Sequence, residues 1–168
     1  MSKFAPDNPE SLKRAILRRA KDNSYKVGRI AALDYGWEAW VQADLGCYLS
    51  VEADTTEAVL QREEYPYGDG RRVDLGIYGP ENIPWHWIEI KTQTPSQGKQ
   101  DFLDNLMADW AKLDDVVVGQ HHARLWAVGF WQSDGQGKPK GFANWDFEVA
   151  NGMNVLYRTK YNPKFSKL

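Results

Sequence analysis

Cysteine is nearly absent from this chain, which has one Cys among its 168 residues. A single thiol excludes an internal disulfide and rules out a Cys-rich zinc site. The sequence also lacks an N-terminal apolar run of the kind that marks a signal peptide, and no stretch of about 18 apolar residues exists that would span a membrane. We therefore expect a protein of the cytoplasm.

An excess of either charge is also missing. The 21 Lys and Arg residues nearly balance the 23 Asp and Glu residues, and the net charge of −2 argues against a protein that coats nucleic acid without specificity. Basic residues are nevertheless concentrated in residues 13–29, where Asp22 is the single acid: Lys13, Arg14, Arg18, Arg19, Lys21, Lys26 and Arg29. This pattern fits a local phosphate footprint, although a solvated helix face is the commoner explanation.

What is present suits one folded domain. Hydrophobic residues make up 42% of the chain and charged residues 26%, which favours a globular fold over disorder. We expect residues 1–168 to form a single domain, with residues 1–26 as a basic helical N-terminal extension. The chain holds eight Trp residues, whose N–H groups need partners, so we expect them at core margins or along a groove.

The periodicity of apolar residues predicts the order helix, helix, three strands, helix, strand, and then a short ending. Asn8 and Pro9 open the first helix, which should fade near residues 22–24, and Gly46 should end the second. The expected ranges are helices over about 9–22, 28–46 and 97–113, strands over 58–65, 72–78, 85–92 and 125–131, and one or two short strands in the last segment, around 145–147 and 155–157. This order predicts an α/β sandwich with a mixed central sheet of about four to five strands, flanked by helices.

The most informative residues are Asp74, Glu89 and Lys91. Glu89 and Lys91 stand two apart in an apolar segment, so a strand would direct both side chains to the same face. If Asp74 lies on the neighbouring strand, two carboxylates and an ammonium group meet, and such a cluster can hold a divalent cation and polarise a water molecule. The plainer alternative is that Glu89 and Lys91 form an exposed ion pair. The flanking Trp87 and Ile88 instead indicate a buried strand, and burying charged groups there costs desolvation free energy that a functional role would explain.

On these three residues and the surrounding order of elements, residues 34–131 resemble the PD-(D/E)xK nuclease superfamily, which includes restriction endonucleases and many repair and phage nucleases. The position before Asp74 holds Val73 rather than Pro, a position that varies widely in that superfamily. The resemblance implies a restriction-endonuclease-like sandwich with the order ααβββαβ. It also implies Mg²⁺ as cofactor, with Mn²⁺ able to substitute.

The resemblance assigns roles to the residues that match the motif. Asp74 and Glu89 would bind the metal together with the backbone carbonyl of Ile90, and Lys91 would orient or help to deprotonate the attacking water. Magnesium suits this chemistry because it takes oxygen ligands and keeps several waters.

A helical carboxylate upstream of the hairpin is also typical of the superfamily. Glu38 is the best-placed candidate and would complete the metal shell or hold a second ion, with Asp34 as the competing choice one turn earlier. Gln42 follows Glu38 by one helical turn and would face the same site. Gln93 continues the face of Glu89 and Lys91 and would touch a phosphate or a water.

Several further residues have both a functional and a plainer interpretation. Arg71, Arg72 and Lys99 would contact phosphates, although for Arg71 and Arg72 ordinary surface charge on turn residues is the commoner explanation. Four tryptophans at helical or strand spacing would either stack on unpaired bases or fill the core: Trp37, Trp40, Trp85 and Trp87. His86, His121 and His122 match no recognised zinc spacing, and His86 is expected to be a packed aromatic residue. Residues 68–72 and 133–141 are the loops most suited to carry specificity.

The sequence thus predicts a metal-dependent nuclease that acts on DNA, with cleavage inside the strand favoured over cleavage from an end. An RNase of the toxin type and a catalytically silent nucleic-acid-binding module on the same fold remain as alternatives. Many members of the superfamily act as dimers, so a homodimer is a reasonable expectation. The residues do not separate DNA from RNA, one metal ion from two, or one pathway from another.

Overall fold

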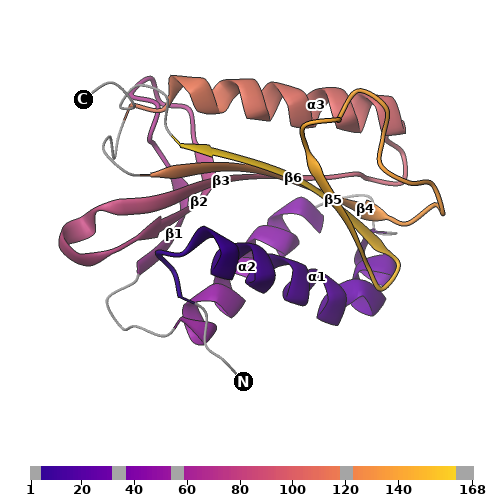
Figure 1. Cartoon of the computed structure of the whole chain (residues 1–168), viewed down its shortest axis with the longest axis horizontal. Coiled ribbons are helices and arrows are strands. Elements are labelled where there is room, and N and C mark those ends of the chain that lie inside the picture. The colour runs from indigo at the N-terminus through magenta and orange to yellow at the C-terminus, as the bar shows by residue number, and fades with distance from the viewer. Residues whose placement is uncertain (1–4, 32–36, 54–58, 118–122, 162–168) are drawn as a thin grey trace.

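The computed structural model describes residues 5–31, 37–53, 59–117 and 123–161, and it contains three α-helices and six strands there (Figure 1). In chain order the elements are α1 (Pro9–Ala31), α2 (Trp37–Glu52), β1 (Val59–Glu64), β2 (Val73–Tyr78), β3 (Pro84–Thr92), α3 (Lys99–Lys112), β4 (Arg124–Gln132), β5 (Asp146–Ala150) and β6 (Met153–Tyr161). Short 3₁₀ turns precede β3 and follow α3. None of the described helices is long and apolar enough to cross a membrane.

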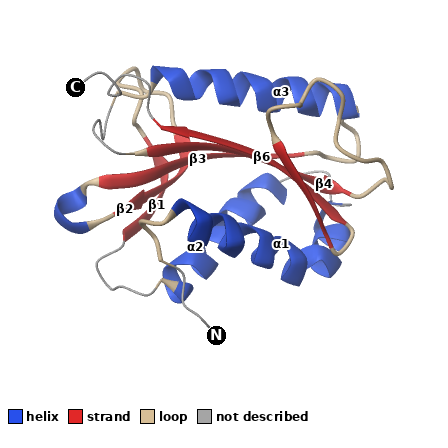
Figure 2. Ribbon diagram, in the orientation of Figure 1, coloured by secondary structure: helices blue, strands red, loops and turns tan. Residues whose placement is uncertain are grey.

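All six strands form one mixed sheet in the order β1-β2-β3-β4-β6-β5. The first three strands pair antiparallel, α3 then carries the chain to β4, and β4 lies parallel to β3. β6 pairs antiparallel with β4, and β5 closes the far edge. Helices α1 and α2 cover one face of this sheet and α3 covers the other, so the α/β class predicted from the sequence is confirmed (Figure 2).

The core divides between the two faces of the sheet. Apolar residues of α1 and α2 pack on one face against side chains such as Ile88 and Ile90. On the other face, Phe102 and Leu106 of α3 pack against β4 at Gly129, where an added Cβ would lie 2.6 Å from Leu106. The sheet is therefore buried on both sides over its central strands, and charged side chains on those strands lie beside a dry core.

Helix α1 is longer than the sequence predicts. Its start is as expected, since the Oδ1 atom of Asn8 accepts the backbone N–H of Glu10 at 2.9 Å. The predicted end near residues 22–24 is wrong, because the helix continues to Ala31. Asn23, which favours helix ends in isolation, is buried here and donates its side-chain amide to Asp44 of α2. A tertiary contact thus outweighs the local preference.

Helix α2 also differs in both bounds. It begins at Trp37 rather than near residue 28, and it passes through Gly46 to end at Glu52. Gly46 is no helix terminator because it serves as a packing position. A Cβ at this residue would lie 3.1 Å from Leu60 of β1.

The sheet has six strands where the sequence predicts about four to five. The one or two short strands expected near the end of the chain are a five-residue and a nine-residue strand, β5 and β6. Asn151 and Gly152 connect them with φ of 53° and 84°, the conformation that a tight hairpin requires.

Candidate active site

Glu89 and Lys91 leave the face of the sheet that α3 covers, and Asp74 lies beside them at the start of β2, hydrogen-bonded to Ile90 of β3 and to Gln42 of α2. Leu75 pairs with Ile88 between antiparallel β2 and β3, which sets Asp74 opposite Glu89. Lys91 follows two residues later on β3 and shares the face by alternation. The sequence-based prediction that Asp74 lies on the strand beside Glu89 agrees with this arrangement.

The Asp74 carboxylate is held at both oxygens. Its Oδ2 atom accepts the backbone N–H of Ile90 at 2.6 Å, and its Oδ1 atom accepts the side-chain amide of Gln42 at 2.7 Å. Burial raises the pKa of Asp74 to about 8; the nearby Glu89 carboxylate adds to the rise and the Ile90 N–H opposes it. Gln42 in turn accepts from Arg62 of β1 at 3.2 Å, so the carboxylate is fixed from three elements.

Glu89 is buried, with 4% of its side chain exposed. Its Oε1 atom accepts the hydroxyl of Tyr67 and pairs with the ammonium group of Lys112 at 2.7 Å. Burial raises the pKa of Glu89, while Lys112 and Tyr67 act in the opposite direction. Lys112 also donates to the backbone carbonyl of Arg72 at 2.6 Å, which ties the end of α3 to the start of β2.

The ammonium group of Lys91 lies between two carboxylates from different helices. It stands 3.3 Å from Glu38 at the start of α2 and 3.6 Å from Asp109 of α3. Burial disfavours the charged form of Lys91, yet Asp109 and Glu38 outweigh burial and raise the pKa of Lys91. Lys91 is therefore protonated at neutral pH, so it donates hydrogen bonds and supplies positive charge rather than accepting a proton.

The start of α2 is fixed to the end of β3 by two contacts. The indole N–H of Trp37, a buried residue, donates to the backbone carbonyl of Gln93 at 3.0 Å. The next residue, Glu38, accepts the backbone N–H of Thr92 at 3.2 Å. A carboxylate in the first turn of a helix is also favoured by the helix dipole. The packing of Trp37 thus places Glu38 beside Lys91. The competing candidate, Asp34, lies outside the described residues.

Negative charge exceeds positive charge at this site. Four carboxylates, from Asp74, Glu89, Glu38 and Asp109, surround two ammonium groups, from Lys91 and Lys112. Burial raises the pKa of Asp109 as it does those of Asp74 and Glu89, so these acids resist ionisation together. A divalent cation that prefers oxygen ligands would relieve the excess.

The donor set fits magnesium in its chemistry, since carboxylate and carbonyl oxygens suit that ion. Asp74, Glu89 and the carbonyl of Ile90 are the residues that would hold it. Among the described residues, no three His, Cys, Asp or Glu side chains form a metal-ligating group. Magnesium commonly binds through one or two carboxylates and keeps several waters, so two protein carboxylates suffice.

The remaining candidates for nucleic-acid contact lie at or beyond the margin of this cluster, where the Arg71 guanidinium lies 4.9 Å from the centroid of the Tyr67 ring. Arg71 pairs with Asp69 and Asp115, at 2.7 and 3.0 Å, and Arg72 pairs with Glu63 at 3.3 Å. Such exposed pairs are weak and exchange readily with other anions.

Lys99 and Gln93 likewise have partners within the chain. Lys99 pairs with Asp134 at 2.7 Å, which joins the start of α3 to the loop at residues 133–141. Gln93 donates its side-chain amide to the carbonyl of Gln97 in the connection between β3 and α3.

His86 and two of the tryptophans belong to the core. His86 is buried and lies between the indole N–H of Trp126 and the carbonyl of Pro6, as expected for a packed aromatic residue. Trp37 and Trp87 are each 1% exposed, so neither is open to stack on a base. His121 and His122 lie outside the described residues.

Three residues of the site were not predicted from the sequence: Tyr67, Asp109 and Lys112. Tyr67 lies in the turn between β1 and β2, just before Gly68-Asp69-Gly70. That segment predicts a turn and gives no indication that the Tyr67 side chain has a functional role. Asp109 and Lys112 are three apart on α3, so both can reach β3 from one side of that helix. In the sequence, Asp109 and Lys112 are an oppositely charged pair three residues apart, next to the apolar residues of α3. An ordinary solvent-exposed helix surface has the same pattern, so the sequence does not mark them as site residues.

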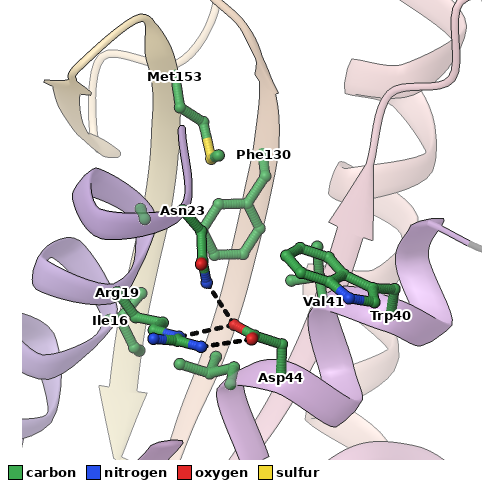
Figure 3. Close-up of a pocket in the computed structure, with 10 residues that line it drawn as sticks. Ile16, Arg19, Asn23, Trp40, Val41, Asp44, Phe130 and Met153 are labelled. Atoms are coloured by element: carbon green, nitrogen blue, oxygen red, sulfur yellow. Dashed lines mark hydrogen bonds and ion pairs between the residues drawn. The ribbon is translucent and has the colours of Figure 1, made fainter. Parts of the chain in front are cut away.

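A hollow elsewhere in the molecule offers no alternative active site. It lies between α1 and α2, beside Arg19, Trp40 and Asp44 (Figure 3). Its volume is about 20 Å³, which is room for about one water molecule.

Comparison with known proteins adds no relative. No family model matches the chain, and neither a curated protein nor a solved structure matches it. The case for function therefore depends on the residues described above.

Proposed function

We propose that this protein is a metal-dependent nuclease that hydrolyses phosphodiester bonds in DNA, with Mg²⁺ as the cofactor and Mn²⁺ able to substitute. One observation carries the proposal. Asp74 and Glu89 are the residues next to the pair Leu75 and Ile88 on neighbouring strands, and the Lys91 ammonium, two residues after Glu89, stands 3.3 Å from Glu38. Cleavage inside the strand is favoured over cleavage from an end, as the sequence suggested.

The chain topology supports a restriction-endonuclease-like sandwich as the fold. The order ααβββαβ, expected for the PD-(D/E)xK superfamily, agrees with the described elements through β4. In this order, the antiparallel strands β2 and β3 carry the acids, and α3 crosses over to a strand parallel to β3. Strands β5 and β6 would then be an addition beyond the common core.

The roles of the residues follow from their surroundings. A bound magnesium ion would supply positive charge to the phosphate and acidify a water molecule. Lys91, which is protonated, would donate a hydrogen bond to the attacking water and offset the negative charge that develops on the phosphate. Glu38 and Asp109 hold the Lys91 side chain in place. Gln42 and the Ile90 N–H fix the direction of the Asp74 carboxylate.

A plasmid-nicking assay tests the proposal. Supercoiled DNA and an RNA of matched sequence are incubated with the protein and Mg²⁺, Mn²⁺ or EDTA. We expect cation-dependent nicking of DNA that falls by about 100- to 1,000-fold in Asp74→Asn and Lys91→Met, the loss typical of a removed charge-stabilising group. Asp104→Asn, which changes an exposed acid of α3, is the matched control and should cleave normally.

Each other outcome contradicts a specific part of the proposal. Cleavage of RNA alone would make the protein an RNase built on the same residues. Tight binding of nucleic acid with no cation-dependent turnover would identify a silent binding module. Wild-type cleavage by both Asp74→Asn and Lys91→Met would remove the proposed site altogether. Light scattering of the same samples, with and without DNA, tests whether the protein acts as a homodimer.

A further inference from the structure

Helix α1 carries a straight row of exposed basic residues along its outer face. The row, here called the α1 stripe, consists of four basic residues and one tyrosine: Arg14, Arg18, Lys21, Tyr25 and Arg29. They follow one another by three or four positions, and all five are exposed. At 3.6 residues per turn they fall within an arc of about 80°, over a length of about 22 Å. The opposite side of the helix enters the apolar core. The stripe therefore faces away from the core, and Arg18 also borders a hollow beside Tyr48 and Glu52 of α2.

The cations of the stripe have no ion-pair partner among the described residues. Two basic residues on the flanks of the same helix, Lys13 and Arg19, do have partners. Lys13 pairs with Glu10 at 3.7 Å, and Arg19 turns toward α2, where its Nε atom donates to Asp44 at 2.7 Å (Figure 3). Elsewhere the ion pairs of the described chain engage Arg71, Arg72, Lys91, Lys99, Lys112 and Lys160.

Like charges are close together in this row, and the nearby acids Glu10 and Asp22 offset only part of the repulsion. Arg14 and Arg18 are four apart, and Arg18 and Lys21 are three apart, spacings at which like charges repel. The chain as a whole carries a net charge of −2, so the stripe is a local exception and not a consequence of composition. An external anion with many charges would offset the repulsion.

Tyr25 indicates what kind of polyanion fits. Its side chain is 69% exposed in the middle of the cations, and the guanidinium of Arg29 lies 4.8 Å from the ring centroid. An exposed aromatic ring flanked by basic groups suits nucleic acid, since bases stack on the ring while phosphates meet the charges. A membrane-binding helix instead presents several large apolar residues to the lipid, and the apolar face of α1 is already buried in the core.

We propose that the α1 stripe binds the sugar-phosphate backbone of nucleic acid, as a surface separate from the cluster around Lys91. The choice of nucleic acid among polyanions rests on the proposed nuclease function. The stripe would hold the substrate and add affinity without sequence preference, because charges that contact phosphates position a duplex but do not read its bases.

The test measures binding without cleavage. Fluorescence anisotropy in EDTA follows a labelled duplex of about 30 base pairs between about 50 and 200 mM NaCl. The stripe variant is Arg14→Gln/Lys21→Gln, and the matched control is Lys13→Gln/Lys26→Gln, which removes the same charge from the same helix outside the stripe. Gln is a good helix former, and circular dichroism checks that both variants fold.

For the stripe variant we expect affinity at low salt to fall by about tenfold or more, and the slope of log Kd against log salt to become shallower by about 2. The control should keep the wild-type slope. In a second titration with one labelled strand of the same duplex, Tyr25→Ala should weaken binding by about tenfold, and it should leave the salt slope of the duplex unchanged.

Two results of the DNA titration would overturn the inference: an unchanged salt slope in the stripe variant, or an equal change of slope in the control. A third result comes from binding of the same proteins to phosphatidylserine vesicles: the stripe variant loses vesicle binding while its DNA affinity stays at the wild-type value. The last result would assign the stripe to a membrane surface. The inference and the proposed function can fail separately. Stripe-dependent binding without any cleavage contradicts only the nuclease, whereas cleavage with a wild-type slope in the stripe variant contradicts only the stripe.

Discussion

Replacing Asp74 by Asn should stabilise the protein in the absence of divalent cations. The Asp74 carboxyl has a pKa of about 8 in the folded protein, against an ordinary value of 3.8. The folded state therefore binds this proton more tightly than the unfolded state does. Stability is greatest below about pH 4 and falls as the pH rises toward 8, because ionised Asp74 is destabilised by burial and by Glu89. Asn carries no charge and escapes this loss.

The size of the effect follows from the same values. Each unit of pKa difference corresponds to about 1.4 kcal/mol, and pH 7 lies about 3 units above the pKa of 3.8 in the unfolded chain, so the proton that Asp74 takes up on folding costs at most about 4 kcal/mol. Asn has a single acceptor oxygen for the two donors, the Ile90 N–H and the Gln42 amide, so it loses one hydrogen bond at every pH. We expect a net gain of about 2 kcal/mol, which raises the Tm of a chain of this length by about 4–8 °C.

Thermal unfolding in EDTA across the pH range measures this gain. The Tm of Asp74→Asn should lie below that of wild type at about pH 4, where only the lost hydrogen bond counts, and should rise above it as the pH increases toward about pH 8. Mg²⁺ at high pH should raise the Tm of the wild-type protein more than that of the variant, because a bound ion stabilises only the state that holds it. Asp104→Asn should differ from wild type by at most about 0.5 kcal/mol at every pH. A variant less stable than wild type throughout would refute the reasoning.

Two further substitutions test the neighbours of Asp74. Lys112→Met removes a cation that lowers the pKa of Glu89; if ionised Glu89 is required for cleavage, the acidic limb of the pH–rate profile should move to higher pH, and an unmoved limb would contradict this. Gly76→Ala places a Cβ 2.5 Å from Trp87 and should cost about 1–3 kcal/mol in a urea titration. Gly137→Ala, with no atom within 4 Å of the added Cβ, is its control and should be close to neutral.

The pairing of Asp74 with Glu89 was predictable because it depends on strand alternation and a single hairpin. Strand side chains alternate with a period of two, so an error of one residue in a strand's bounds leaves the facing pattern intact. β3 runs from Pro84 to Thr92, close to the predicted range, and Lys91 shares the face of Glu89 as expected. The register of a tight antiparallel pair then follows from the connection between its strands.

The helical contributions were harder to predict, because a helix can turn any of its polar residues toward a neighbour. Asp109 and Lys112 look like an ordinary charged surface until the position of α3 over β3 is known. Trp37 carried a stronger signal, since a large apolar residue at the start of a helix requires burial. Its indole N–H finds a partner in the backbone of Gln93, and this contact, which spans distant parts of the chain, determines where Glu38 lies.

The hairpin of β5 and β6 was predictable but was missed. Asn-Gly between two apolar runs is a strong hairpin signal, and Asn151 and Gly152 adopt the positive φ that it implies. The opposite error concerns Gly46, where a helix-ending residue marks close packing instead. At Gly152 the local preference of Gly for a turn determines the structure, since no atom lies within 4 Å of an added Cβ. At Gly46 tertiary packing determines the structure, since an added Cβ would lie 3.1 Å from Leu60.

The charge balance of the cluster argues against a purely structural role. A structural ion pair would match one acid to one base, as Arg19 and Asp44 do between α1 and α2. Around Lys91 and Lys112 the acids outnumber the bases, and burial raises the pKa of Asp74 until it resists ionisation near neutral pH. Such an arrangement reduces stability, and residues that reduce stability persist where they have another task. Asp74→Asn tests this trade-off between stability and function directly, because we expect the substitution to raise the stability of the fold and to abolish most of the cleavage.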